Sequence, residues 1–145
     1  MVKKILFICK HNIFRSRVAE IWFNRTNKDR NYRASSAGII PWNKKNTIGD
    51  IGYVAEKKAA KKFGIDLSIK SQPVTASLLN KTDILVVVAD DVPAKIFRTD
   101  DSFNGKVLAW KVPDVKDEDR DKEKIAEKTI RFIQKKVEGL VKTLN

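Results

Sequence analysis

Cysteine, histidine and methionine are almost missing from this chain of 145 residues, which contains one of each. The single cysteine, Cys9, excludes a disulfide within the chain and is typical of a protein from the reducing cytoplasm. One histidine and one cysteine are too few for a typical structural zinc site. No apolar run is long enough for a membrane-spanning helix, and the first residues lack the apolar core and cleavage site of a secretory signal. We therefore expect a soluble, cytoplasmic protein with no membrane partner.

Acidic residues are scarce beside basic ones: 18 Asp and Glu face 30 Lys and Arg, which gives a formal charge of +12. Three interpretations compete, namely attraction of a phosphorylated substrate, nucleic-acid binding, and ordinary surface composition. No RNA- or DNA-binding motif accompanies the basic residues, which are spread along the chain in pairs such as Lys57-Lys58. We favour surface composition, with substrate attraction as a side effect, and nucleic acid is a disfavoured partner.

Strand-like and helix-like segments alternate along the chain. Strands are predicted at residues 2–8, 32–37, 83–88 and 106–109, and helices at 16–27, 52–63, 92–97 and in the segment that follows the loop 111–121. The continuously apolar sequence of residues 83–88, DILVVV, indicates a parallel strand that is covered on both faces. The predicted fold is a single-domain (residues 1–145), doubly wound α/β structure with a four-stranded parallel sheet and helices on both faces.

Two further patterns support this assignment. Gly64 follows the predicted helix 52–63 and favours its termination there. The closing helix carries one apolar stripe, formed by Ile125, Ile130, Ile133, Val137, Leu140, Val141 and Leu144.

The loop between the first predicted strand and helix holds the most informative sequence, CKHNIFRS at residues 9–16. A thiol at the carboxyl end of a strand, before a helix, lies where backbone N–H groups converge on an anion. Those N–H groups and nearby Arg15 would stabilise the thiolate form of Cys9, and Arg15 would hold phosphoryl oxygens. The alternative is a buried cysteine beside a surface arginine, which so short a pattern alone would favour. The strand, loop and helix context supports the catalytic interpretation.

Five segments, in order along nearly the whole chain, resemble the low-molecular-weight protein tyrosine phosphatases, a family that includes thioredoxin-coupled arsenate reductases. They are the loop 9–16 with Val18-Ala19-Glu20, the segment Ser36-Ala37-Gly38, the segment Phe63-Gly64-Ile65-Asp66 with Ser71, the strand 83–90 that ends in a carboxylate, and Trp110-Lys111-Val112-Pro113-Asp114. Each segment is a modest signal alone, and their order makes the resemblance specific.

The resemblance implies three catalytic residues. Cys9 would attack phosphorus and form a phosphocysteine, and Arg15 would bind two equatorial oxygens and stabilise the transition state. Asp114 would protonate the leaving oxygen and then activate water. Neighbouring acidic residues compete for the last role, but the spacing from Trp110 favours Asp114; the competitors are Asp117, Asp119 and Asp121. Because the arginine and the amides neutralise the phosphoryl charge, no metal or cofactor is expected.

The remaining implied residues support the loop or bind substrate. Asn12 would hold the loop through a hydrogen bond towards Ser36, or simply favour a tight turn. Ser16 would donate to the thiolate and can also cap the helix. The other phosphate donors would be the amides of the loop, from Lys10, His11, Asn12, Ile13 and Phe14 to Arg15.

Three residues near the predicted cleft have two interpretations each. Trp42 would either stack on an aromatic phosphoester or pack in the protein. Asp90 would orient Arg15 or shape the mouth of the site, or simply be an exposed carboxylate at a strand end. His11 is placed to touch substrate, but no step requires it as a catalyst. Trp22 and Trp110 are assigned to the core.

Four departures from the family pattern bear on activity. His11 stands where the family usually has glycine, a residue that permits positive φ or close approach of phosphate. Phe14 replaces a second cysteine, so oxidised Cys9 cannot be protected by a neighbouring disulfide. Val115 replaces a proline, which predicts a less rigid loop around Asp114. The aromatic residues that often follow the acid are missing, so preference for phosphotyrosine is less secure than phosphatase chemistry.

The leading hypothesis is a cysteine-dependent phosphomonoesterase that acts on a phosphotyrosine protein or a small aryl phosphate and is inhibited by phosphate and vanadate. One alternative is a pseudophosphatase that binds phosphate without turnover. Another is an arsenate reductase, which needs an external thiol because the chain has no further cysteine. A basic nucleic-acid-binding protein is ranked below these.

Overall fold

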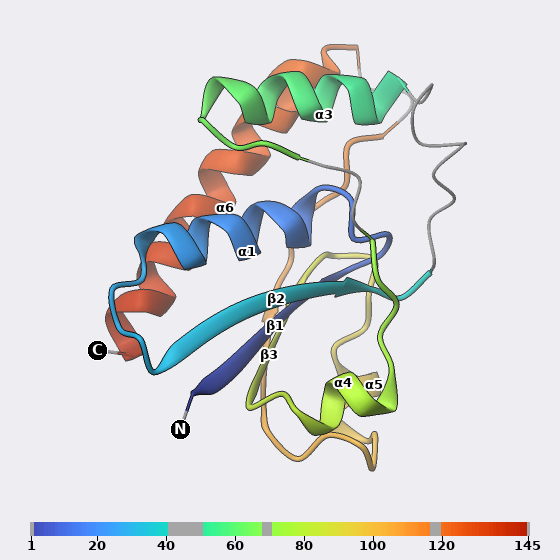
Figure 1. Ribbon diagram of the computed structural model, residues 1–145. Helices are drawn as coiled ribbons and strands as arrows, with labels where there is room; N and C mark the ends of the chain where they lie inside the picture. The colour runs from blue at the N-terminus through green and yellow to red at the C-terminus, as the bar shows by residue number, and fades with distance from the viewer. Residues whose placement is uncertain (1, 41–50, 68–70, 117–119, 145) are drawn as a thin grey trace.

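Four parallel strands form the centre of the computed structural model, which describes residues 2–40, 51–67, 71–116 and 120–144 (Figure 1). They lie in the order β2-β1-β3-β4, and their bounds are β1 Lys3–Cys9, β2 Tyr32–Gly38, β3 Ile84–Val88 and β4 Lys106–Trp110. The chain leaves β1 for β2 on one side and later passes to β3 on the other. The carboxyl end of β1 is therefore the topological switch point, where ligands bind in open α/β sheets.

Helices cover both faces of this sheet, so the predicted α/β fold is confirmed. Their bounds are α1 Arg15–Thr26, α3 Ile51–Lys62, α4 Ala76–Asn80, α5 Lys95–Arg98 and α6 Lys122–Leu144. The first face packs against α1 and α6, with α3 lying on α6, and the other face packs against α4 and α5 (Figure 1). The two layers agree with the continuous apolar sequence of β3, which is buried from Leu85 to Val88.

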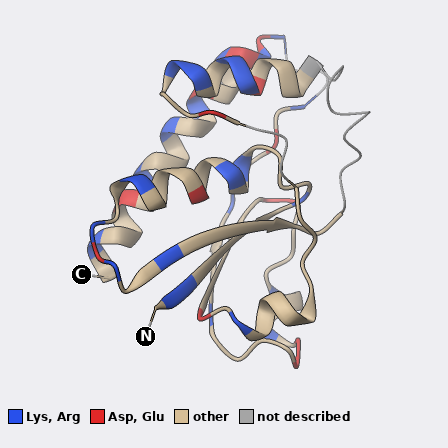
Figure 2. Cartoon of the chain, viewed as in Figure 1, with Lys and Arg blue, Asp and Glu red and all other residues tan. Residues whose placement is uncertain are grey.

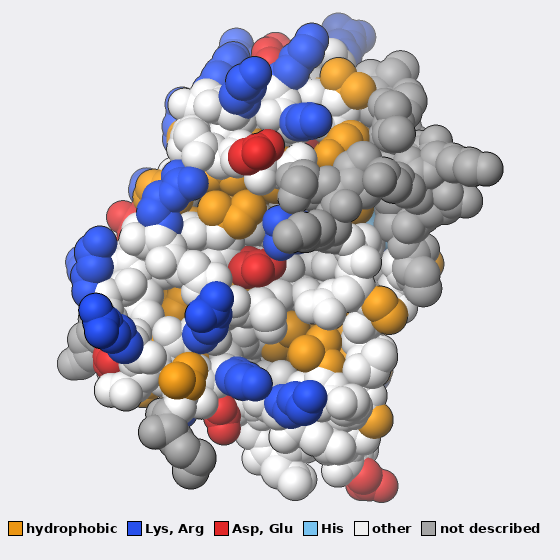
Figure 3. All heavy atoms as spheres, viewed as in Figure 1, with side chains coloured by type: hydrophobic (Ala, Val, Ile, Leu, Met, Phe, Trp, Pro, Cys, Tyr) orange, Lys and Arg blue, Asp and Glu red, His pale blue; other side chains and the backbone are white. Residues whose placement is uncertain are grey.

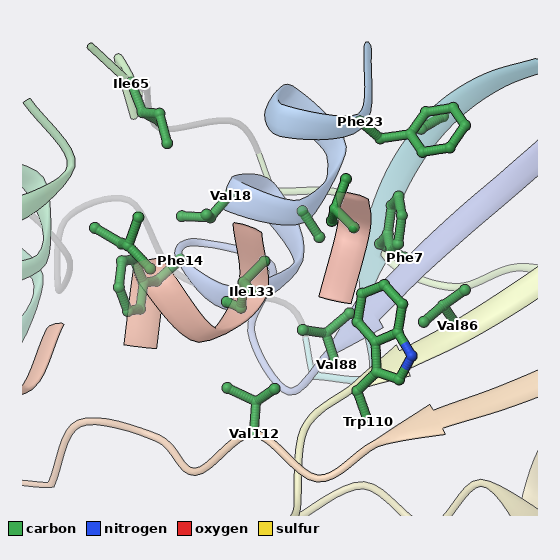
Figure 4. Close-up of a cluster of buried hydrophobic side chains, with 14 of the residues drawn as sticks. Phe7, Phe14, Val18, Phe23, Ile65, Val86, Val88, Trp110, Val112 and Ile133 are labelled. Atoms are coloured by element: carbon green, nitrogen blue, oxygen red, sulfur yellow. The ribbon is translucent and has the colours of Figure 1, made fainter. Parts of the chain in front are cut away.

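Alternate residues of β1 divide the core into two clusters. Ile5 and Phe7 lie in the cluster under α1 and α6, whereas Leu6 and Ile8 lie in the cluster under α4 and α5. This division follows from the two-residue period of a strand. In the first cluster the Trp110 ring lies 5.7 Å from the Phe7 ring, between centroids, and the close-up shows both side chains together (Figure 4). Trp110 is thus a core residue, as predicted.

The predicted stripe of α6 is largely confirmed. Ile130, Ile133, Val137 and Leu140 are buried, and Val141 and Leu144 pack against the same cluster. The expected contribution of Ile125 was wrong, because Ala126 and Thr129 fill the first turns of the buried face instead. Trp22 is only half-buried at the edge of the cluster, where the Arg25 guanidinium lies 5.7 Å from its ring centroid.

Two short helices differ from the sequence prediction. The helix expected at 92–97 is confined to Lys95–Arg98, beyond Pro93. The sequence prediction missed α4, which is only five residues long and too short to show a helical period. Its start is a polar cap, since the Leu78 N–H donates to Thr75 Oγ1 at 3.1 Å. Gly64, with φ of +70°, ends α3 as predicted.

Basic side chains are spread over the surface and do not form a single stripe. They occur on α1, α3 and α6 and on the first residues of β1, with acidic side chains between them (Figures 2 and 3). This distribution agrees with the interpretation of the charge as surface composition. In the described part of the chain no helix combines the length and the apolar character needed to cross a membrane.

Candidate active site

The candidate site lies at the carboxyl end of β1, where the cysteine loop (residues 9–15) connects the strand to α1. Cys9 is the last residue of β1 and pairs in register with Gly38 of β2. Two further backbone bonds continue this pairing into the loop: the Ile39 N–H donates to the Cys9 carbonyl at 3.2 Å, and the Ile40 N–H donates to the Lys10 carbonyl at 2.9 Å. The thiol is therefore placed at the switch point of the sheet.

The Cys9 thiol is 2% exposed and has two hydrogen-bonding neighbours. The Asn12 N–H donates to Sγ at 3.3 Å, and the Ser16 hydroxyl lies 3.0 Å from Sγ. Ser16 Oγ also accepts from the Asn12 side-chain amide at 2.7 Å, which leaves its own hydrogen available for sulfur. Donors at these two positions stabilise negative charge on Cys9, as a thiolate nucleophile requires. The contact predicted between Ser16 and the thiol is present.

Asn12 is the central support of the cysteine loop. It is 1% exposed and has φ of +59°, the left-handed conformation that asparagine adopts more readily than most residues. No other described non-glycine residue has positive φ, so His11 does not need the conformational freedom of the glycine that it replaces.

The predicted hydrogen bond from Asn12 towards Ser36 was wrong. Asn12 Oδ1 accepts from the Gln72 N–H at 3.1 Å, while its amide donates to Ser16. Ser36 is 3% exposed, its hydroxyl donates to Glu20 Oε1, and its carbonyl accepts from Gln72 Nε2 at 2.7 Å. The chain at residues 71–72 thus bridges the two, which is a long-range arrangement that sequence spacing does not reveal.

Two more contacts fix the loop against the neighbouring chain. Ser71 Oγ donates to the His11 carbonyl at 2.7 Å. A Cβ placed on Gly38 would lie 2.8 Å from the His11 carbonyl carbon and 3.0 Å from the Asn12 nitrogen. Gly38 is therefore needed because the loop backbone passes directly over it. Ser71 and Gly38 both belong to segments that carry the family resemblance, but Gln72 had no such signal.

The other predicted loop residues fall into two groups. Phe14 is 2% exposed and lies in the core with Val18 and Ile133, so its side chain anchors the loop and does not line the site (Figure 4). Lys10, His11 and Ile13 are half-buried. Burial, followed by the charge of Lys10, lowers the pKa of His11, although a backbone hydrogen bond with Ile40 and then the charge of Asp114 act in the opposite direction. The neutral imidazole is therefore favoured.

Arg15, the first residue of α1, is 3% exposed and surrounded by carboxylates. Its Nη1 donates to the Val112 carbonyl at 2.9 Å and lies 3.1 Å from Asp91 Oδ1. Its Nη2 lies 3.8 Å from Asp114 Oδ2. Burial alone would lower the pKa of Arg15, but the charges of Asp114, Cys9 and Asp91 outweigh it and the pKa is raised. The guanidinium is permanently charged and beside the thiol.

The contact between Asp90 and Arg15 is weaker than the predicted role of Asp90 in orienting Arg15 requires. Its Oδ1 lies 3.8 Å from Nη1, and its side chain is 46% exposed. The neighbouring Asp91 is the closer partner and was missed. The tandem Asp90-Asp91 after an apolar strand is the only sequence signal for it.

Asp114 lies in the aspartate loop (residues 111–116), beyond β4, with its side chain 40% exposed. Its Oδ1 accepts from the Val115 N–H at 2.9 Å. A proline at position 115 has no N–H and cannot make this bond. The loop is further anchored by Val112, which is fully buried and bonded through its N–H to the Trp110 carbonyl at 2.9 Å. The replacement of proline therefore does not leave Asp114 without a local constraint.

Three predicted residues lie outside the described part of the chain: Trp42, Asp117 and Asp119. Asp121 is described, and its carboxylate accepts from the Lys124 N–H at 3.0 Å near the start of α6. Asp114, and not Asp121, forms an ion pair with Arg15 among the described contacts. In the described ranges no group of three or more His, Cys, Asp or Glu side chains is arranged to hold a metal ion.

The site combines a buried thiol that has polar donors, an arginine beside the thiol, and a carboxylate within reach of that arginine. This combination defines a class of α/β proteins, in which a cysteine and an arginine form an oxyanion site at the switch point of the sheet. Residues 4–145 match the model of the low molecular weight phosphotyrosine protein phosphatase family. The chain belongs to this family. No curated protein sequence matches it.

Solved structures share the fold over nearly the full length. Wzb from Vibrio vulnificus, solved in complex with benzylphosphonate, is 21% identical with a TM-score of 0.74, and the match covers 99% of both chains. A low molecular weight protein tyrosine phosphatase from T. tengcongensis is 20% identical with a TM-score of 0.71, covering 97% of this chain and 99% of that one. An arsenate reductase from Archaeoglobus fulgidus is 24% identical with a TM-score of 0.69, covering 94% and 98%.

Proposed function

We propose that this protein is a metal-independent phosphomonoesterase that cleaves phosphotyrosine or a related aryl phosphate through a phosphocysteine at Cys9. The observation that carries the proposal is the convergence at one sheet edge of a buried thiol, a buried arginine and a half-exposed carboxylate. Cys9 ends β1 and Arg15 begins α1, and Asp114 joins them from the loop after β4, far along the sequence. Family membership supports the same chemistry.

In the first step Cys9 acts as nucleophile. The thiolate attacks phosphorus, an S–P bond forms, and the P–O bond to the leaving group breaks. The Asp114 carboxyl group gives its proton to the departing oxygen. Arg15 and the amides of the cysteine loop bind the three equatorial oxygens, on which charge is spread in the transition state.

In the second step water removes the phosphoryl group. The Asp114 carboxylate takes a proton from water, whose oxygen attacks phosphorus while the S–P bond breaks. Inorganic phosphate and the Cys9 thiolate are released. Ser16 assists here, because a hydrogen bond to sulfur makes the thiolate a better leaving group.

Substrate class is inferred from apolar residues next to the cysteine loop. Ile39 and Ile40 are 37% and 45% exposed beside the loop, with half-buried Ile13 on the loop itself. Apolar side chains at this position favour an aromatic leaving group over a small polar one. The neighbour from Vibrio vulnificus binds benzylphosphonate, whose ring and tetrahedral phosphonate match this inference.

The experiment is hydrolysis of p-nitrophenyl phosphate by wild type, Cys9→Ser and Asp114→Asn, with vanadate as inhibitor. We expect no turnover but retained phosphate binding in Cys9→Ser, and a loss of ~10²-fold or more in kcat for Asp114→Asn. Full activity of Cys9→Ser would refute the mechanism. Vanadate binding without any turnover in wild type would instead identify a pseudophosphatase, and tight salt-dependent oligonucleotide binding without hydrolysis would identify a nucleic-acid-binding protein.

Arsenate reduction is a second candidate, favoured by fold neighbours that are named arsenate reductases. Arsenate is tetrahedral like phosphate, and Cys9 would bond to arsenic while an As–O bond breaks and its oxygen leaves as water. A thiol from a separate molecule would then attack Cys9, forming a mixed disulfide while arsenic(V) is reduced to arsenic(III), and a second such thiol would release Cys9. Arsenate-dependent oxidation of glutathione or mycothiol in the absence of phosphatase activity would favour this function.

A further inference from the structure

Two adjacent carboxylates follow β3, and they meet Arg15 in different ways. Asp91 places Oδ1 3.1 Å from Nη1 and Oδ2 3.4 Å from Nη2, so both of its oxygens face the two terminal nitrogens. Asp90 brings one oxygen to within 3.8 Å of Nη1 and is more exposed, at 46% against 34% for Asp91. Only Asp91 has the two-point geometry that fixes the orientation of a guanidinium.

The backbone around this pair is held by β4 and the aspartate loop. The Ala89 N–H donates to the Trp110 carbonyl and the Asp90 N–H donates to the Val112 carbonyl, both at 3.0 Å. The same Val112 carbonyl accepts from Arg15 Nη1 at 2.9 Å. One peptide oxygen therefore ties the end of β3, the aspartate loop and the guanidinium together, and Asp91 completes this frame from the side of β3.

These contacts occupy one edge of the guanidinium and leave another available. Nη1 donates to the Val112 carbonyl and Nη2 donates one N–H to Asp91 Oδ2, while Asp91 Oδ1 forms an ion pair with Nη1. Within the described residues, Nε and the second N–H of Nη2 make no hydrogen bond. We propose that Asp91 is a positioning residue, which holds Arg15 so that its Nε–Nη2 edge is presented to the phosphoryl group above Cys9.

This role makes a specific kinetic prediction, which rests on the proposed phosphatase function. Substrate binds a different edge of the Arg15 guanidinium from the one that Asp91 contacts, so the Asp91 carboxylate stays in place when substrate binds. Removing it frees the guanidinium to rotate, which weakens the paired contact needed in the transition state. It also removes a negative charge beside an anionic substrate, which favours ground-state binding. Turnover should therefore fall without a rise in KM.

The experiment compares Asp91→Ala and Asp91→Asn with Asp90→Ala, which removes the same charge one residue away. We expect kcat for p-nitrophenyl phosphate to fall roughly 10- to 100-fold in Asp91→Ala, with KM unchanged or lower. Asp91→Asn, which keeps one oxygen acceptor, should recover part of kcat. Asp90→Ala should lose less than about threefold, as expected for a partly exposed charge pair. Asp101→Ala, in an exposed turn beyond α5, controls for charge alone and should match wild type.

A second measurement reads the position of Arg15 without catalysis. In wild type the Arg15 Nη protons should give resolved, slowly exchanging NMR signals, and Asp91→Ala should lose them while Asp90→Ala retains them. Equal kcat losses in the two alanine variants, or unchanged Arg15 signals in Asp91→Ala, would overturn the inference while leaving the phosphatase proposal intact. An inactive wild type would refute the phosphatase proposal, and the NMR comparison would then decide the role of Asp91.

Discussion

The cysteine loop and the aspartate loop supply the two halves of the candidate site, and packing constrains them to very different degrees. In the first, Cys9, Asn12, Arg15 and Ser16 are between 0% and 3% exposed. Hydrogen bonds connect Cys9, Asn12 and Ser16 to one another, and Arg15 donates to the Val112 carbonyl and to Asp91. In the second, the Asp114 side chain is 40% exposed and hydrogen-bonds the N–H of the next residue.

This difference agrees with the roles that the proposed mechanism gives the two halves. The nucleophile and the arginine must be placed before substrate arrives, because donors aimed at the transition state are effective only when they need no rearrangement. In the proposed mechanism the acid gives a proton to the leaving group and then takes one from water, so it needs access to solvent. The following changes test this division, from the largest expected effect to the smallest.

Arg15→Lys should cause the largest loss. Lysine keeps the charge but not the planar fork that binds two oxygens together. We expect kcat to fall by about 10³-fold or more, measured with p-nitrophenyl phosphate. Arg33→Lys, at an exposed position of β2, is the matched control and should leave kcat unchanged. A loss under tenfold in Arg15→Lys would show that the loop amides alone stabilise the transition state.

Gly38→Ala tests how closely the cysteine loop is packed. The new Cβ would meet the His11 carbonyl carbon at 2.8 Å, so the loop must move. We expect a loss of about 1–3 kcal/mol in the free energy of unfolding, measured by urea denaturation, together with reduced kcat. Gly139→Ala is the control, because no atom lies within 4 Å of its Cβ. That helical position should instead gain up to about 1 kcal/mol. Equal effects of the two substitutions would contradict the close approach.

Val115→Pro tests the aspartate loop. It removes the N–H that donates to Asp114 Oδ1 and restricts the backbone of Asp114 itself. We expect kcat to fall roughly 3- to 10-fold. Inhibition by phosphate should be unchanged, because the substitution does not alter the cysteine loop. Val115→Ala keeps the N–H and should stay closer to wild type. If Val115→Ala had the larger effect, packing of the valine and not its N–H would be what positions Asp114.

His11→Gln should have the smallest effect, on stability as a function of pH. Burial lowers the pKa of His11 from its ordinary 6.5, so the folded protein binds fewer protons there than the unfolded chain. Stability should therefore be lost as pH falls from about 6.5 through the lower folded pKa. The variant should show a flatter dependence in urea denaturation over this window. An identical pH dependence in the two proteins would show that titration of His11 does not contribute to stability.

The sequence predicted the fold, and the place of Cys9 in it, better than it predicted the contacts around the candidate site. The strand, loop and helix pattern placed Cys9 at the end of β1 because hydrophobic period and turn residues are local signals. The partners of Asn12 and Arg15 were assigned to Ser36 and Asp90, whereas Gln72 and Asp91 make the closer contacts. These depend on how distant segments meet across a sheet edge, which no local pattern encodes.

The replacement of proline by Val115 is a second case in which the folded structure differs from the local sequence prediction. By sequence, the loss of a rigid residue predicts a looser loop. In the structure the restored N–H bonds to Asp114, and Val115 also packs against the core. A backbone donor thus constrains the carboxylate in place of the ring, and only the folded geometry shows it.

The central claim is that Cys9 becomes phosphorylated during turnover. The direct measurement is rapid acid quenching of the wild-type protein mixed with p-nitrophenyl phosphate, followed by mass spectrometry of the peptide that contains Cys9. We predict one phosphoryl group on Cys9 during turnover and none in Cys9→Ala, which should also be inactive. Turnover with an unmodified Cys9 at every quench time, or an active Cys9→Ala variant, would contradict the account.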